Sequence, residues 1–295
     1  MSRKYNIDFV GKFPIAVVFS LILVAASLFL FFTKGLNYGV DFRGGAEIQV
    51  KFSDKIDMGL LRSELDDKFN SSSVQQIGED SQNELLIKVS GSEDNLNTVT
   101  DEITKMLMTE FSAINPTIQK TDIVGPKAGE QLRISGFQAL IWALLMIMIY
   151  IALRFDYKYS PGAIVALIHD VVIIVGIFIV MDKEFSLQIV GALLAVIGYS
   201  VNDTVVVYDR VRENEEKDVQ SSLTTNINNA LNETLTRTIL TSFTTLVVAG
   251  TMFAMGGGVI HDFFFAITLG VIIGTYSSLF VAAPTILFFD KFNKA

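Results

Sequence analysis

Three ionisable residues lie in or at the edge of long apolar stretches of this sequence. They are Asp170, Asp203 and Arg237. A charged side chain is costly in hydrocarbon, so an ionisable residue at membrane depth indicates a functional site by default. Polar neighbours on the same helical faces strengthen this interpretation, and they are Asn202, Thr241, Thr244 and Thr245. Hydroxyl groups both donate and accept hydrogen bonds, so such a row can hold water or pass a proton.

A carboxylate near an arginine suggests proton handling. In a low dielectric a carboxyl group favours its neutral form, while a nearby guanidinium favours the charged form. Arginine keeps its proton, so Arg237 is the fixed charge against which Asp203 would switch. Their depths in two successive helices are similar, which predicts that they meet as an ion pair. Two alternatives remain open: a static pair that fixes helix register, or an Asp203 that reaches the interface.

Asp170 lies nine residues into its apolar stretch. At 1.5 Å per residue it is roughly 13 Å deep, near the hydrocarbon centre. Its own helix face is otherwise aliphatic, and the sequence identifies no partner for it. A place on a proton path and a structural role are both open for Asp170. His169 points roughly 100° away around the helix, and we expect it to be a hydrogen-bonded packing residue.

The elements that hold these residues are predicted from hydropathy. Hydrophobic residues make up 51% of the 295, and the mean hydropathy is +0.46. Uninterrupted apolar stretches of about 20 residues are long enough to cross a bilayer as helices. The sequence therefore predicts an α-helical polytopic membrane protein with six transmembrane helices, at roughly 13–33, 136–154, 161–181, 185–207, 238–256 and 262–289.

Basic residues in the short connections predict the orientation of these helices. They gather at the N-terminus, in the second-to-third and fourth-to-fifth loops and in the tail, for example Lys12, Arg154, Arg210, Arg212 and Lys217. Because cytoplasmic loops carry the excess of Lys and Arg, both termini are expected in the cytoplasm. Three parts follow: residues 1–34 with the first helix, an external domain at 35–130, and a five-helix membrane domain at 131–295.

The external segment is predicted as a small α+β domain. The net charge of −8 is local, because acidic residues exceed basic ones between residues 35 and 130 and nearly balance elsewhere. Its patterns predict a strand at 46–52, a helix at 56–69, strands at 73–77 and 84–89, a helix from about Asp94 to Phe111 and a strand at 116–124. This order is that of the ferredoxin-like fold.

Three further patterns concern how the helices pack and connect. Leu223, Ile227, Leu231 and Leu235 form one apolar stripe within 219–237, which suits either a helix on the cytoplasmic membrane face or one packed on the ends of the bundle. Small residues recur at Gly191, Ala195, Gly198 and Asn202, a face that lets a neighbouring helix come close. The stretch GVDFRGG at 39–45 is predicted as a tight turn with a local Asp41–Arg43 pair and no catalysis.

Several classes of function are excluded by composition. The chain has no cysteine and two histidines, so neither a thiol nucleophile nor a Cys- or His-based metal site is expected. It has no GxxxxGK[ST] loop for a nucleotide phosphate. A nucleic-acid surface needs a basic patch, which this sequence lacks. We therefore expect no cofactor, no metal, no nucleic-acid partner and no enzymatic activity.

Four ordered segments resemble the SecF family, the smaller integral subunit of the SecD–SecF complex of bacterial protein export. They are GVDFRGG after the first helix, GYSVNDTVVVYDRVREN in the fourth, NETLTRTILTSFTTL in the fifth and GVIIGTYSSLFVAAP in the sixth. The resemblance covers the whole chain. Asp203 and Arg237 match the family's membrane-embedded proton-pathway aspartate and arginine. Asp41, Arg43, Gly44 and Gly45 match a family marker that has no assigned chemistry.

The resemblance implies a function that spacing alone does not. The family belongs with the proton-driven resistance–nodulation–division transporters, and SecD supplies six further helices in pseudo-symmetry. The complex is understood to use the proton gradient to help move preproteins beside the SecYEG channel, in the bacterial inner membrane and among its lipid. Expected partners are therefore SecD, SecYEG, unfolded preproteins, protons and membrane lipid. Two alternatives remain open: a small-molecule or lipid exporter of the same superfamily, and a non-transporting insertion scaffold.

Overall fold

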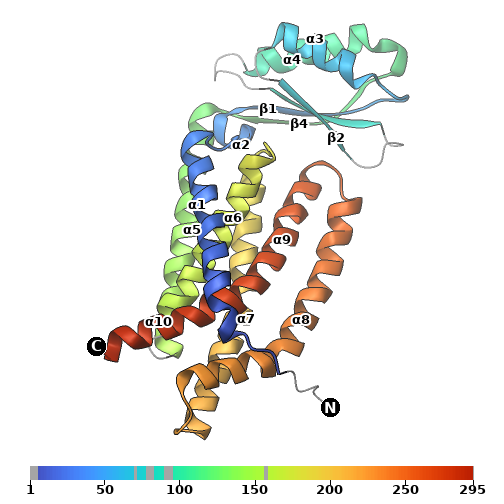
Figure 1. The fold of residues 1–295 in the computed structure, drawn as a ribbon. Coiled ribbons are helices and arrows are strands. Elements are labelled where there is room, and N and C mark those ends of the chain that lie inside the picture. The colour runs from blue at the N-terminus through green and yellow to red at the C-terminus, as the bar shows by residue number, and fades with distance from the viewer. Residues whose placement is uncertain (1–5, 70–71, 78–82, 90–95, 156–158, 295) are drawn as a thin grey trace.

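The computed structural model describes residues 6–69, 72–77, 83–89, 96–155 and 159–294. A bundle of long helices holds a small sheet domain at one end, and both chain ends lie at the other end of the bundle (Figure 1). Six helices of the described part are long and apolar enough to cross a membrane. The predicted fold class, with six spans and an α+β domain between the first two, is confirmed.

The membrane helices follow the predicted order. They are α1 (Phe13–Thr33) after a short 3₁₀ turn (Val10–Lys12), α5 (Pro126–Arg154), α6 (Ser160–Val180), α7 (Leu187–Lys217), α8 (Leu223–Met255) and a last span made of α9 (Gly258–Ser277), a π-helical turn (Ser278–Ala282) and α10 (Ala283–Lys294). Pro284 has no N–H to donate to the preceding turn, which accounts for the irregular turn at this point. From there α10 runs away from the axis of α9 (Figure 1).

Three helices extend beyond their predicted membrane segments. α5 begins at Pro126, within the segment assigned by sequence to the external domain, directly after the last strand. α7 continues to Lys217 as a polar helix. The predicted separate helix at 219–237 is the first part of α8. Hydropathy locates the apolar middle of a helix but does not predict the polar turns that continue the helix beyond it.

The apolar stripe at the start of α8 packs onto the end of the bundle. Ile227 and Leu231 are fully buried, and Leu235 is 7% exposed. They join a core cluster with Phe9 and Phe13 from the start of the chain. Of the two placements left open by the sequence, packing on the bundle is therefore the one observed.

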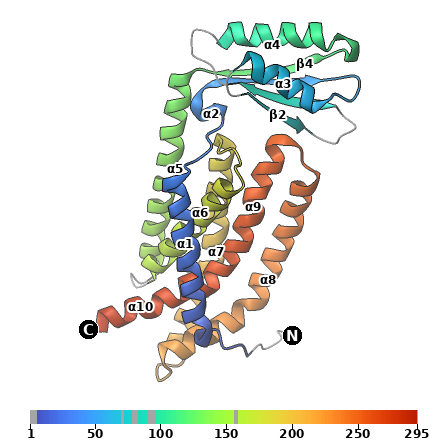
Figure 2. The ribbon, with the colours of Figure 1, turned by 45° about the horizontal axis from the view of Figure 1, so that its top comes forward.

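The small domain has the predicted strand and helix order. Its elements are β1 (Gly45–Lys51), α3 (Met58–Lys68), β2 (Ser72–Ile77), β3 (Glu84–Val89), α4 (Leu96–Glu110), a 3₁₀ turn (Ser112–Ile114) and β4 (Thr117–Val124). The sheet is antiparallel with the strand order β2-β3-β1-β4, and α3 and α4 cover the face turned away from the bundle (Figures 1 and 2). Asp94, the expected start of the second helix, lies outside the described residues.

Alternation along the strands determines which face meets the bundle. Ile48 and Val50 of β1 and Ile87 of β3 are fully buried under the two helices. Glu47 and Lys88 alternate with them and therefore lie on the opposite face, toward the membrane helices. Asp57 caps α3, because its Oδ1 accepts hydrogen bonds from the N–H groups of Gly59 (2.8 Å) and Leu60 (3.3 Å).

The GVDFRGG stretch forms a short helix, α2 (Val40–Arg43), rather than a tight turn. The predicted Asp41–Arg43 pair is wrong, since these two described residues form no ion pair with each other. Arg43 donates to Asn37 Oδ1 at 3.1 Å, and Asp41 accepts from a backbone N–H of another helix. Local spacing could not predict the hydrogen bond to Asp41, because its donor, the N–H of Leu187, lies far along the chain.

Candidate functional site

Asp203 is a buried carboxylate without a hydrogen-bond partner. It lies on α7 and is 2% exposed. Neither of its oxygens has a partner among the described residues. Buried charges in proteins are normally paired, because the isolated ion loses its hydration without compensation. Ionising Asp203 in this position is therefore costly.

The predicted ion pair between Asp203 and Arg237 is not formed in this conformation. No contact within 4.0 Å joins them, although Arg237 is near enough for its charge to act on the carboxylate. Arg237 lies on α8 with its side chain exposed, while the next residue, Thr238, is fully buried. The sequence alone could not predict the rotation of α8 about its axis, which leaves the Arg237 side chain exposed.

Hydrogen bonds one turn away establish the register of α7 against α8. The Tyr199 hydroxyl donates to Ser242 Oγ at 3.3 Å, and the Ser242 and Thr275 hydroxyls are 2.6 Å apart. These helices run in opposite directions, so Asp203 and Thr238, each four residues from that bond, lie at the same level. The Thr238 hydroxyl is buried and also lacks a partner among the described residues. Two unpaired polar groups thus lie at one level of adjacent helices.

The predicted row of threonine hydroxyls is bound to its own helix. Thr241, Thr244 and Thr245 donate to the carbonyls of Arg237, Leu240 and Thr241, at 3.0, 3.0 and 2.9 Å. Such back-bonding is the usual arrangement for a threonine inside a helix. Thr244 is exposed, as is Asn202 on α7. The structure does not bring these side chains into contact with Asp203.

Arg237 lines a polar cavity of about 470 Å³ at the end of the bundle that holds the termini. Its charged lining comes from α5, α7 and α8, and consists of Arg154, Asp209, Arg210, Glu213, Glu233 and Arg237. Arg210 pairs there with Glu213 at 2.8 Å and with Glu233 at 3.3 Å. This cavity gives Arg237 a polar surrounding on one side, while Asp203 lies behind it in the bundle.

Asp170 has the opposite environment to Asp203. It is 1% exposed, and Oδ2 accepts hydrogen bonds from Ser200 (2.6 Å) and Ser277 (2.8 Å). His169 Nδ1 lies 3.0 Å from Oδ1, so a proton on Nδ1 completes the set. Three helices, α6, α7 and α9, therefore meet at this carboxylate. The predicted role of His169 as a hydrogen-bonded packing residue fits, and the serines were missed as partners because they come from distant helices.

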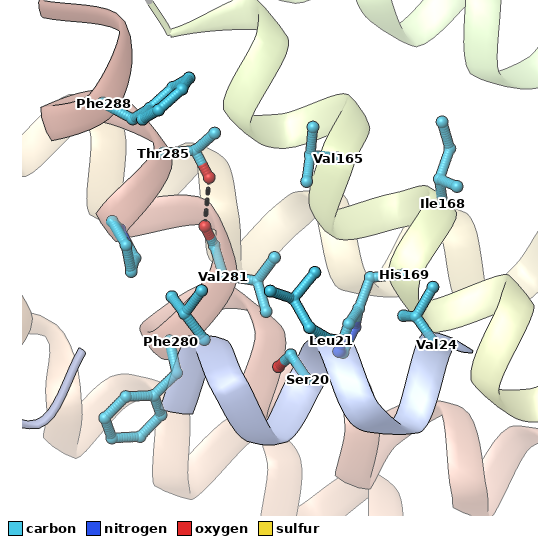
Figure 3. A pocket seen from close by; sticks show the side chains of 12 residues that line it. Ser20, Leu21, Val24, Val165, Ile168, His169, Phe280, Val281, Thr285 and Phe288 are labelled. Carbon is cyan, nitrogen blue, oxygen red and sulfur yellow. Dashed lines mark hydrogen bonds between the residues drawn. The ribbon is translucent and has the colours of Figure 1, made fainter. Parts of the chain in front are cut away.

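An apolar cavity lies beside this cluster. It measures about 480 Å³ between α1, α6 and the last span, and His169 is one of its few polar lining residues (Figure 3). Ser20 and Thr285 are the other two, and the Thr285 hydroxyl is held by the carbonyl of Val281. Neither Asp203 nor Arg237 lines this cavity. It is therefore separate from the candidate proton site.

The predicted small-residue face of α7 is open. Gly191, Ala195, Gly198 and Asn202 are all exposed, and a side chain added at Gly191 or Gly198 would meet nothing within 4 Å. By contrast Gly270 and Gly274 of α9 pack inside the bundle against Val196 and Ser200. Within the described residues, no helix therefore packs closely on this small-residue stripe, which would admit one. Among the described residues, no group of three or more His, Asp or Glu side chains could hold a metal ion.

Two family models match the chain. The first is described as the C-terminal part of the protein export membrane protein SecD/SecF, and it matches residues 103–291. The second is the SecD/SecF GG motif, matched over residues 29–56, which include Asp41 through Gly45. Together they cover most of the sequence, including α5 to α9 and the short helix α2.

Curated relatives match over nearly the full length. Protein translocase subunit SecF of Thermodesulfovibrio yellowstonii is 40% identical over 294 residues, with 98% of this chain and 96% of the relative covered. The subunit of the same name from Rickettsia prowazekii is 39% identical, with 99% and 94% covered. The crystal structure of SecDF, a translocon-associated membrane protein from Thermus thermophilus, matches at 32% identity and a TM-score of 0.84. Of this structure the chain covers 39%, while 98% of the chain is matched.

Proposed function

This chain belongs to the SecF family, and from that premise we propose that it is an accessory subunit of bacterial protein export that couples proton flow to late preprotein translocation. The proton carrier in this proposal is Asp203, with Arg237 as its fixed countercharge. The chain has no catalytic role in this scheme and needs no cofactor. The observation on which the proposal depends is the buried Asp203 carboxylate without a partner.

The geometry supports a switch between two states of this pair. With no partner and little exposure, the neutral form of Asp203 is the one compatible with the observed packing. Arg237 is near but directed toward the polar cavity. When Asp203 loses its proton, the carboxylate and the guanidinium attract each other across a low-dielectric gap, which favours a rotation or shift of α8 toward α7. Gaining a proton releases Arg237 again.

The proton route proposed here begins and ends in polar surroundings. The cavity at Arg237 opens the site toward the end of the bundle that holds the termini. On the other side of Asp203, Tyr199, Ser242 and Thr275 form a hydrogen-bonded cluster across α7, α8 and α9. One charge moved through the membrane potential supplies about 2.3 kcal/mol per 100 mV, which is enough for a modest helix movement. Asp170, fully hydrogen-bonded, is proposed to hold helices together beside this route.

The orientation and partners follow from the same proposal. The positive charges near the termini favour a multi-pass protein of the bacterial cytoplasmic membrane with both termini in the cytoplasm and the α+β domain in the periplasm. The open small-residue face of α7 is the surface proposed to receive a helix of SecD. The SecYEG channel, unfolded preproteins, protons and membrane lipid complete the set of proposed partners.

The test is export into vesicles with and without a proton gradient, using Asp203→Asn in complex with SecD. This variant has nearly the same shape and cannot ionise, so stimulation by the gradient should disappear while unstimulated export and binding to SecD persist. If the chain were only a scaffold, export would respond normally to the gradient in this variant. Normal stimulation would therefore refute the coupling role, and Asp170→Asn run beside it shows whether that residue belongs to the route.

A further inference from the structure

The GVDFRGG segment caps the helix that holds Asp203. Asp41 Oδ2 accepts a hydrogen bond from the backbone N–H of Leu187 at 3.0 Å, across 146 positions of sequence. Leu187 is the first residue of α7, and Ser186 at its N-cap makes no side-chain cap hydrogen bond. The first N–H groups of a helix have no partner within it and bear a partial positive charge. The Asp41 carboxylate of α2 therefore provides the hydrogen-bond acceptor at the start of α7 that the side chain of its N-cap residue, Ser186, does not provide.

Backbone pairing holds the same two segments together. The Phe185 N–H donates to the Asn37 carbonyl at 2.7 Å, and the Gly39 N–H donates to the Phe185 carbonyl at 3.0 Å. Phe42 of α2 is 3% exposed, and its ring lies 6.1 Å from that of Phe185. Residues 37–42 thus clasp the start of α7 by hydrogen bonds and by apolar packing, and Asp41 is the charged member of this clasp.

The two glycines connect this clasp rigidly to the sheet. Gly44 has φ +80°, and a side chain there would lie 2.7 Å from the Cα of Pro126 at the start of α5. Gly45, the first residue of β1, has φ +157°, and a side chain there would lie 2.3 Å from the Val89 carbonyl of β3. Only glycine tolerates both the backbone angle and the close approach. Asp41 is therefore four residues from β1 through a segment packed on both sides.

An ion cluster around the buried Lys88 makes a second connection next to the first. Lys88 of β3 lies 2.5 Å from Glu184 and 3.3 Å from Glu47 of β1. Glu184 precedes α7 by three residues, so this contact also joins the sheet to the start of that helix. The α+β domain is thus attached to α7 by contacts as well as by its tethers to α1 and α5.

We propose that Asp41 is the positioning residue through which α7 and the α+β domain move as one unit. Its carboxylate holds the first turn of α7 to α2, and α2 continues directly into β1. A displacement of α7 at the level of Asp203 is thereby delivered to the sheet at its other end. This inference rests on the proposed function for its consequence, while the cap itself is a separate physical claim.

The test uses the chain in complex with SecD in lipid nanodiscs and compares Asp41→Ala with Asp57→Ala. Asp57 is a matched control, because it caps α3 by the same chemistry and α3 lies on the face of the sheet turned away from the bundle. Hydrogen exchange of the first-turn amides of α7 should accelerate about fivefold in Asp41→Ala, the effect of losing a typical cap. Exchange there should be unchanged in Asp57→Ala, in which the start of α3 exchanges faster instead.

Gradient-stimulated export is the second measurement on the same variants. Asp41→Ala should lose most of the stimulation, while its export without a gradient is unchanged. Asp57→Ala should retain the stimulation. Asp41→Asn should restore most of the stimulation, because its amide oxygen still caps the helix. Unchanged exchange at the start of α7 in Asp41→Ala would refute the cap. Faster exchange with full stimulation would refute the coupling through Asp41. A failure of the proposed function would show in a different variant, as normal gradient stimulation of export in Asp203→Asn.

Discussion

Asp170 and Asp203 are both buried carboxylates, but they differ in what surrounds them. Asp170 receives two serine hydroxyls and lies against His169, while Asp203 has no partner among the described residues. A buried ion stabilises a structure only when its hydrogen-bond capacity is used. We infer that Asp170 is a hydrogen-bonded part of the framework, whereas Asp203 has no such contacts to hold it.

Replacing each aspartate by asparagine should therefore change stability in opposite ways. Asp170→Asn replaces an acceptor oxygen by an NH₂ group that must then face a donor, so the chain should lose about 1–3 kcal/mol of unfolding free energy. Asp203→Asn removes a carboxyl without partners and should be at least as stable as the parent. Denaturant unfolding of both variants in the same detergent checks this. Equal losses in the two variants would contradict the distinction.

Arg237→Lys should strongly reduce gradient-stimulated export although it keeps the positive charge. A guanidinium presents a planar fork that matches a carboxylate, and an ammonium does not. Losing a charge-assisted bond of this kind should reduce the stimulated rate about tenfold. The control is Arg210→Lys, in which the replaced side chain pairs with Glu213 and Glu233 beside the same cavity. Full stimulation in Arg237→Lys would show that the two groups do not pair at any stage.

At the scale of elements, the contact between the sheet and the start of α7 depends on charges that titrate. Burial raises the pKa of Glu47 above its ordinary value of 4.5, against the opposing effect of the nearby Lys88 ammonium. For Lys88 burial acts to lower the pKa, and the carboxylates of Glu184 and Glu47 outweigh it and raise the pKa. A carboxyl group whose pKa is higher in the folded state than in the unfolded state stabilises the folded state fully at a pH below its unfolded-state pKa. This contribution is lost as the pH rises through the folded-state pKa.

Glu47→Gln should therefore change how the stability of the α+β domain depends on pH. The variant cannot ionise, so its stability relative to the parent should increase as pH rises above about 4.5, the ordinary value for this group. Pulse proteolysis of the domain in urea, from pH 4 to pH 8, measures the difference. A constant difference between Glu47→Gln and the parent over this pH range would contradict the assignment.

The sequence was sufficient for the elements but not for the contacts between them. Apolar length located six spans, and the residue patterns located the strands and helices of the small domain. What it could not supply is the rotation of each helix about its axis, which leaves Arg237 outside while Thr238 is buried. Nor does a local pattern show that Asp41 caps a helix 146 residues away. Both depend on tertiary packing, which no periodicity encodes.

For the whole molecule, the open face of α7 indicates that the bundle is one part of a larger membrane assembly. Gly191, Ala195 and Gly198 are exposed at a spacing that suits close helix packing, with the polar Asn202 at one end. In lipid, small residues do not by themselves gain from exposure, and they favour contact with another helix. The exposed Arg237 of α8 also needs polar surroundings if it lies at membrane depth. A partner such as SecD would satisfy both needs.

Ala195→Leu should weaken association with SecD without changing the fold of the chain. Both the alanine and its small neighbours are exposed, so a larger side chain is accommodated within the chain but separates α7 from a partner helix. Overpacking of a close contact costs about 1–3 kcal/mol, which corresponds to a loss of affinity of about 5- to 150-fold. The matched control is Ala26→Leu, an identical change at an exposed alanine of α1, a helix that packs on α6.

Affinity measured by energy transfer in nanodiscs should fall for Ala195→Leu alone, at equal thermal stability of both variants. If both variants bind SecD as the parent does, the face that receives SecD lies elsewhere, and the exposed Arg237 must find its polar surroundings in the cavity at the end of the bundle alone.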